Sequence, residues 1–144
     1  MVRHARALGL KYIGVSDHSQ IVTYANGLTP RRLQEQAEAI AKLNARLKGF
    51  RVLHGTECDI LPDGSLDFPA EVLRGLDFVI GSVHSSFRMS REEMTARVCK
   101  ALSNEHLHIL GHPTGRLLLE REAYAIDLEA VIAAAAEHGK AIEI

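Results

Sequence analysis

The chain has 144 residues, of which 47% are hydrophobic and 24% are charged, and its formal net charge is −1. This length suffices for one domain with a substantial core, and the near-neutral charge excludes a surface that attracts nucleic acid over its whole extent. Cys58 and Cys99 have no metal-binding or redox spacing, so both are expected to stay reduced in the cytoplasm. The longest apolar run, residues 130–136, is too short to span a bilayer, and the N-terminus lacks the apolar core of a signal peptide.

Short apolar segments alternate with capped or amphipathic segments along the chain. Thr29 and Pro30 are typical of a helix start, and apolar residues then recur every three or four positions, which predicts one buried helix face. Ser90 and Glu93 have the spacing of a capping box, so another helix is expected to begin there. The predicted helices cover residues 2–8, 29–47, 69–76, 90–102 and 127–139, and the predicted strands cover residues 11–16, 51–59, 77–83, 107–110 and 140–144.

This alternation of strands and helices, with a repeat of roughly thirty residues, is typical of a parallel α/β sheet or barrel. The first predicted helix has no strand before it, and the last predicted strand has no loop after it. We therefore expect residues 1–144 to form one domain that is truncated at both ends. The expected fold is a partial (βα) barrel with about five parallel strands.

Four of the predicted strands end on side chains of the kinds that bind metal ions, namely Asp17 and His18, Glu57, His84, and His112. In a barrel of parallel strands the carboxyl ends of all strands open onto one face, so these residues should converge. Three histidines and two carboxylates suit a transition metal. Each residue alone could be a strand cap or a surface side chain. Their repeated occurrence at four successive strand ends favours a metal site.

Two arginines, Arg88 and Arg116, follow His84 and His112 at the same interval of four residues. Each is expected on a loop above the pocket, where a guanidinium group could bind a phosphate with two hydrogen bonds. A surface salt bridge is the alternative explanation for each arginine. His54 is expected to lie in the body of its strand, away from the ligands.

Four segments of the chain resemble a known family. The strings SDHS, GTECDILPDGSLDFP, DFVIGSVHSSFRMS and LGHPTGRLLLER are similar to the PHP (polymerase and histidinol phosphatase) domain, and most similar to the C-terminal PHP domain of bacterial family X DNA polymerases. The resemblance covers essentially the whole chain. It implies a distorted, seven-stranded TIM-like barrel that binds up to three metal ions, manganese or zinc.

The resemblance also implies roles for the candidate ligands. Glu57 corresponds to the carboxylate that bridges two metal ions, and His84 and His112 correspond to the other ligands of one of them. His18 corresponds to a ligand of the third ion, with Asp17 as a further ligand or its partner. The family's opening His-x-His and closing Asp-x-His motifs are absent from the expected positions, so the resemblance implies one ion for these residues alone.

By the same resemblance, the expected function is that of a metal-dependent phosphoesterase acting on DNA. The expected activity is that of a 3′–5′ exonuclease acting at DNA 3′ ends. The expected partner is a repair polymerase domain in the same parent chain, and no association with a membrane is expected. Glu57, His84 and His112 would act through the metal, and Arg88 and Arg116 would bind the phosphate. Two alternatives stay open, a histidinol-phosphatase-like phosphomonoesterase and a non-catalytic PHP scaffold of a polymerase. The retained ligands argue against the scaffold.

Overall fold

Five parallel strands form a single open sheet in the computed structural model, which describes all residues from 1 to 144. The strands follow one another across the sheet in their chain order, from β1 to β5. This confirms the predicted α/β fold with about five parallel strands, and the open sheet is consistent with a partial TIM-like barrel. The strands are β1 (Tyr12–His18), β2 (Arg51–Asp59), β3 (Phe78–Ser82), β4 (Ile109–Leu110) and β5 (Ala141–Ile142). The helices are α1 (Val2–Ala7), the short 3-10 helix η1 (Thr23–Ala25), α2 (Pro30–Asn44), α3 (Ala70–Leu73), α4 (Arg91–Leu102) and α5 (Leu128–Glu137).

The local signals in the sequence act as expected at the helix starts. The Thr29 hydroxyl accepts a hydrogen bond from the backbone of α2, and Ser90 and Glu93 form a complete capping box at the start of α4. The helices predicted to end at residues 47 and 76 end three residues earlier, at Asn44 and Leu73, and one strand boundary differs because of strand pairing. β1 runs to His18, past its predicted end, because its ladder with β2 continues to the pair His18 and Glu57. The sequence did not predict η1.

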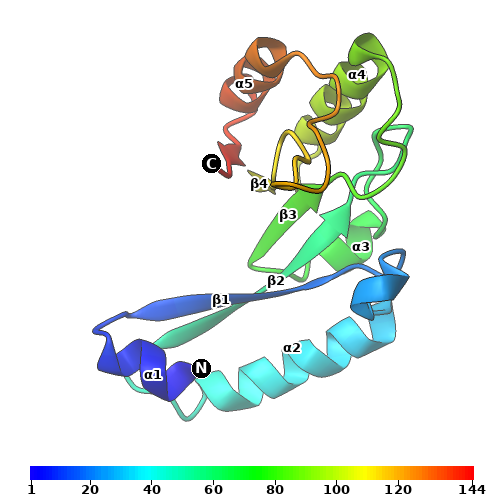
Figure 1. Ribbon diagram of the computed structural model, residues 1–144. Helices are drawn as coiled ribbons and strands as arrows, with labels where there is room; N and C mark the ends of the chain where they lie inside the picture. Colours follow the sequence, from blue (N-terminus) through cyan, green and yellow to red (C-terminus); the bar gives the residue numbers. More distant parts are fainter.

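The helices and the apolar core lie on one face of the sheet. Figure 1 shows the curved sheet with α1 and α2 beside β1 and β2, and with α4 and α5 beside the later strands. The larger core cluster joins strand residues such as Val79 and Leu110 to Met94 of α4 and Val131 of α5. Side chains alternate between the two faces of a strand, so the site residues can occupy the other face. None of the helices is both long and apolar enough to cross a membrane.

β2 is the strand that organises the sheet around the site. It pairs with β1 from Arg51 to Glu57 and with β3 from Gly55 to Asp59. On its helix-facing side, the buried His54 ring lies 2.9 Å from the side-chain oxygen of Gln36 in α2, which agrees with its predicted place in the strand body. On the opposite side β2 carries Glu57 and Asp59 at its carboxyl end.

Two glycines on the side of the sheet away from the helices make room for the ring of Phe78. A Cβ atom on Gly55 would lie 2.5 Å from the Phe78 ring, and one on Gly14 would lie 2.9 Å from it. Both distances are shorter than side chains tolerate. The ring of the first residue of β3 therefore rests directly on the backbones of β1 and β2, which brings the three strands together below the site.

Replacing Gly55 by alanine should destabilise the fold. The added methyl group overlaps the Phe78 ring, and overpacking of this kind costs about 1–3 kcal/mol of unfolding free energy. Urea denaturation of the Gly55→Ala variant should show the loss, and a second substitution, Phe78→Leu, should restore part of it. Gly75→Ala is the matched control, because the nearest atom to a Cβ there lies 3.6 Å away. Equal effects at Gly55 and Gly75 would contradict this account of the packing.

Candidate metal centre

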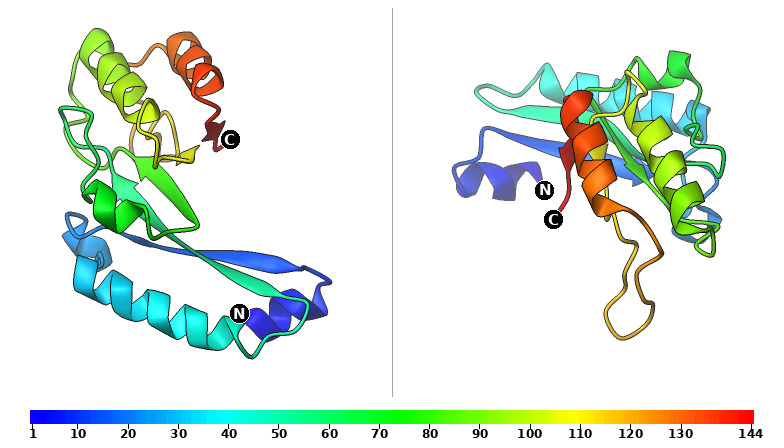
Figure 2. Two further views of the ribbon diagram at one scale, coloured as in Figure 1. Left: turned by 180° about the vertical axis from the view of Figure 1, so that it is seen from behind. Right: turned by 90° about the horizontal axis from the view of Figure 1, so that it is seen from above.

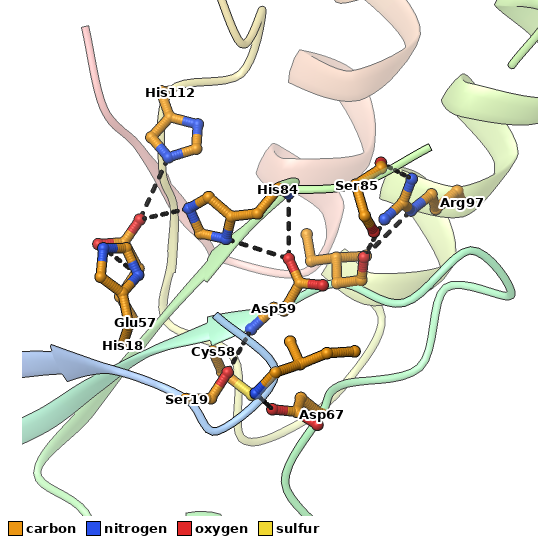
Figure 3. A network of polar contacts seen from close by, with 12 residues as sticks. His18, Ser19, Glu57, Cys58, Asp59, Asp67, His84, Ser85, Arg97 and His112 are labelled. Atoms are coloured by element: carbon orange, nitrogen blue, oxygen red, sulfur yellow. Dashed lines mark hydrogen bonds and ion pairs between the residues drawn. The ribbon is translucent and has the colours of Figure 1, made fainter. Parts of the chain in front are cut away.

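Four side chains meet at the carboxyl ends of successive strands. His18 is the last residue of β1, Glu57 lies near the end of β2, and His84 and His112 follow the last residues of β3 and β4. Figure 3 shows the three histidines gathered around the Glu57 carboxylate. His18 and Glu57 are directly paired in the sheet register, so their side chains emerge on the same face. The parallel topology therefore brings together residues that are up to 94 positions apart, from His18 to His112.

The two oxygens of Glu57 face different histidines. Oε1 lies 3.1 Å from His112 Nε2 and 3.3 Å from His84 Nε2, whereas Oε2 lies 3.7 Å from His18 Nδ1. The hydrogen bonds from His112 and then His84 hold the pKa of Glu57 far below its usual value, although partial burial opposes this. The carboxylate is consequently ionised at any working pH.

The donor set fits a transition metal. His18, Glu57 and His84 each offer a ligand atom, and these atoms all lie within 4.8 Å of one another. His18 Nδ1 and His112 Nδ1 are buried and have no hydrogen-bond partner. Imidazole nitrogens and a carboxylate oxygen bind zinc or similar ions at about 2.0–2.2 Å, so modest side-chain adjustment would let these atoms share one ion. His18, Glu57 and His84 therefore form a group that could hold a metal ion, as expected of a metal-dependent domain.

Asp59 orients the ring of His84. Its carboxylate is only 1% exposed, and Oδ1 accepts hydrogen bonds of 3.0 Å from both the backbone N–H and the ring Nδ1–H of His84. Because a carboxylate can only accept, the proton of a neutral His84 must lie on Nδ1. Nε2, the atom that faces Glu57, is then left with its lone pair available for a metal ion.

A buried arginine fixes the segments that carry this pair. The side chain of Arg97 in α4 is 2% exposed. Its guanidinium group donates hydrogen bonds to the carbonyl of Ile60, the residue after Asp59, and to the carbonyl of Ser85, the residue after His84, at 3.0 Å for Ser85. Figure 3 shows this chain of contacts leading from Arg97 to the pocket. Neither Asp59 nor Arg97 could be identified from the sequence, because their roles depend on contacts between residues distant in the chain.

A second carboxylate holds the loop that carries His112. Glu143, which follows β5, accepts a 2.7 Å hydrogen bond at Oε2 from the backbone N–H of His112. His112 itself has a positive φ of 24°, an unusual conformation for a residue with a side chain. Its predecessor must be glycine, because a Cβ at Gly111 would collide with Ser82. This turn aims the His112 ring at Glu57.

Asp17 does not join the other predicted ligands. Since it precedes His18 in an extended strand, its side chain points to the opposite face of the sheet. There Asp17 Oδ2 accepts a 2.6 Å hydrogen bond from Gln36 Nε2 of α2. The structure thus places His18, Glu57, His84 and His112 together and leaves Asp17 on the helix side.

The cluster forms the floor of a pocket of about 440 Å³. One wall is the connection between β4 and α5, which Figure 2 shows extending away from the body of the protein. Arg116 lies on this wall as predicted, whereas Arg88 is exposed and does not line the pocket. The lining residues are His18, Tyr24, Glu57, His84, Phe87, His112, Gly115, Arg116, Leu117 and Arg121.

Arg121 takes the place that was expected for Arg88. Its Nε donates a 2.8 Å hydrogen bond to the carbonyl of Gly115, and its guanidinium carbon lies 4.0 Å from the centre of the Phe87 ring. No carboxylate pairs with Arg116 or Arg121 in the structure. Two unpaired guanidinium groups therefore face the same pocket as the histidines. The local sequence around Arg121, with Glu120 and Glu122 beside it, gives no sign of this role.

Comparison with known proteins identifies the family of this chain. A family model described as "PHP domain" matches residues 1–144. The chain belongs to the PHP domain family. It is 46% identical over 136 residues, or 94% of its length, to "DNA polymerase/3'-5' exonuclease PolX" of Bacillus subtilis. It is also 33% identical over its full length to a "Probable phosphatase" of Caldicellulosiruptor bescii and 34% identical over 99% of its length to a "Probable phosphatase" of Thermoanaerobacter sp..

The chain spans only part of these relatives, 24% of the B. subtilis protein and 56% and 55% of the two phosphatases. Family membership, together with relatives named as an exonuclease and as phosphatases, supports a hydrolase of phosphate esters.

Removing the charge of Asp59 should weaken metal binding. In an Asp59→Asn variant the Nδ1–H of His84 loses its charged acceptor, and loss of such a partner lowers metal affinity by about 10- to 100-fold. Isothermal titration with manganese or zinc measures this. Asp77→Asn is the matched control, because Asp77 also accepts a hydrogen bond from a strand backbone, that of His54, but far from the pocket. An Asp77 variant that lost as much metal affinity as the Asp59 variant would contradict the orienting role.

Metal binding should release a proton and strengthen as the pH rises. Burial lowers the pKa of His84, but its hydrogen bonds to Asp59 and Glu57 outweigh this and raise it from 6.5 to about 9 in the metal-free protein. His84 is thus protonated at neutral pH, and an ion must displace that proton. The apparent affinity should rise up to about pH 9 and level off above it. Calorimetry in buffers of different ionisation enthalpy will count the protons, and a count of zero at pH 7 would contradict this protonation state.

Proposed function

We propose that this chain is the catalytic domain of a metal-dependent 3′–5′ exonuclease that removes nucleotides from DNA 3′ ends. One observation carries the proposal. The pocket has Glu57 and three histidines on its floor, and on its wall two arginines without carboxylate partners, Arg116 and Arg121. Metal ligands beside unpaired cations suit an anionic substrate whose phosphorus is attacked by a metal-activated nucleophile.

Each group of residues in the pocket has a distinct role in the proposed reaction. Glu57, His84, His112 and His18 would hold the metal. Bound manganese or zinc would lower the pKa of a water molecule and polarise the phosphate. Asp59 keeps the proton of His84 on Nδ1, away from the metal side. Arg116 and Arg121 would pair with non-bridging phosphate oxygens and neutralise the charge that develops in the transition state.

The comparisons favour a DNA substrate over a small phosphate monoester. The relative named as a 3′–5′ exonuclease is 46% identical to this chain, whereas those named as phosphatases are 33% and 34% identical. We therefore include in the proposal a polymerase domain carried by the same parent protein. A histidinol-phosphatase-like phosphomonoesterase is the second candidate, supported by the phosphatase relatives that match this chain over nearly its whole length. A non-catalytic scaffold has no need for four converging ligands and two unpaired arginines.

Loss of Glu57 should abolish the exonuclease activity. A Glu57→Ala variant of the full-length protein should remove nucleotides from a primer 3′ end at least about a hundred-fold more slowly in manganese, because Glu57 is the carboxylate shared by the three histidines of the proposed metal centre. Polymerisation should persist. His54→Ala is the matched control, because His54 is buried on the helix side of the same strand and should affect stability more than catalysis.

The same preparation separates the two candidate functions. The wild-type protein should degrade the primer and leave histidinol phosphate largely intact. Rapid hydrolysis of histidinol phosphate with an untouched primer would favour the phosphomonoesterase. If the Glu57 variant degraded the primer at the wild-type rate, the assigned metal centre would be wrong and the scaffold would become the better explanation.

A further inference from the structure

One aromatic side chain that lines the pocket is mostly exposed to solvent and is not part of the apolar core. Tyr24 lies on η1 and lines the pocket above His18 and Glu57, yet it is 80% exposed. Its ring belongs to neither of the two apolar clusters of the protein. Burying an aromatic ring against a partner is favourable, so a bare ring beside a functional pocket is available for a ligand.

The loop that carries Tyr24 is held at both ends. Val22 is buried, and the backbone N–H of Leu28 donates a 2.7 Å hydrogen bond to the carbonyl of His18. Between them, Nη1 of Arg32 donates to the carbonyl and the side-chain oxygen of Asn26, both at 3.3 Å. The loop is therefore tied directly to a metal-ligand residue and to α2. Tyr24 is presented from a fixed backbone, so little conformational entropy of the loop is lost when a ligand binds.

The other aromatic residue that lines the pocket is already covered. One face of the Phe87 ring is covered by the Arg121 guanidinium at 4.0 Å, and the ring stacks on Tyr124 with centroids 6.2 Å apart. Phe87 thus serves as a support for Arg121. Tyr24 is left as the one lining aromatic residue with a free face, and it comes from the loop after β1, whereas both arginines come from the connection between β4 and α5.

We propose that Tyr24 is the stacking surface for the base of the 3′-terminal nucleotide, while Arg116 and Arg121 bind the scissile phosphate. This deepens the proposed function and rests on it. A nucleotide offers a π-face and an anionic phosphate, which match the free ring and the two arginines without carboxylate partners. Stacking does not distinguish one base from another, which suits an enzyme that must remove every nucleotide in turn.

The test compares two oligonucleotides that differ only at the 3′ end. One ends in a normal nucleotide and the other in an abasic nucleotide with the same phosphate. A Tyr24→Ala variant should lower kcat/KM on the normal end by about ten-fold, mainly through KM, and should leave the abasic end unchanged. Tyr24→Phe keeps the ring and should retain wild-type values. Tyr12→Ala is the matched control, because Tyr12 is also exposed but lies at the start of β1, away from the pocket.

Binding supplies a readout that does not depend on catalysis. Fluorescence anisotropy of the labelled oligonucleotides on the metal-free protein should show tighter binding of the normal end by the wild type, and no such preference in the Tyr24→Ala variant. Equal losses on both ends, or no loss on either, would overturn the stacking role. If the wild type degraded neither oligonucleotide, the exonuclease proposal would fail, and the anisotropy difference would still decide whether Tyr24 recognises a base.

Discussion

The half-buried carboxylate of Glu57 is the group around which the functional end of this protein is arranged. It lies among three histidines that come from three other strand ends, and its two oxygens face different members of the set. Burying a carboxylate is costly unless it is paired or bound to a cation. Here three imidazoles surround it, and a bound metal ion would also compensate its charge.

The rest of the site follows from holding those imidazoles in place. Two of the histidines donate their backbone N–H to a carboxylate, His84 to Asp59 and His112 to Glu143. Asp59 also fixes the ring of His84, and Arg97 ties down the neighbouring backbone. These supports come from β2, from the segment after β5 and from α4. The positions of the histidines in the pocket therefore depend on contacts from elements spread over most of the chain.

The pocket places different chemistry on its different sides. The floor carries Glu57 and the three histidines, the wall formed by the β4–α5 connection carries Arg116 and Arg121, and the loop after β1 carries the free ring of Tyr24. A phosphoester linked to an aromatic group fits this division. Membership in the PHP domain family accounts for the floor, and the relatives named as an exonuclease and as phosphatases both act on phosphate esters by their names. Under the proposed function, the side chains on the walls of the pocket would select among phosphate esters.

Much of the fold could be predicted from the sequence because its signals are local. Helix starts at Thr29 and Ser90 are encoded by side chains that bond to backbone a few residues away. The alternation of strands and helices made a parallel α/β sheet the expected fold, and it placed His18, Glu57, His84 and His112 at the carboxyl ends of neighbouring strands. The order of the strands then required that these residues meet.

The remaining features were decided by tertiary structure. Asp17 is next to His18 in sequence, but the period of two along a strand sends it to α2. The sequence pointed to Arg88 and gave no sign of Arg121, yet of these two only Arg121 lines the pocket, where its guanidinium group contacts the Phe87 ring. Asp59 and Tyr24 became visible only through contacts and exposure. The sequence determined which strand ends carry chemistry, while the face of each strand and the path of each loop determined which side chains share the pocket, because both depend on packing between residues distant in the chain.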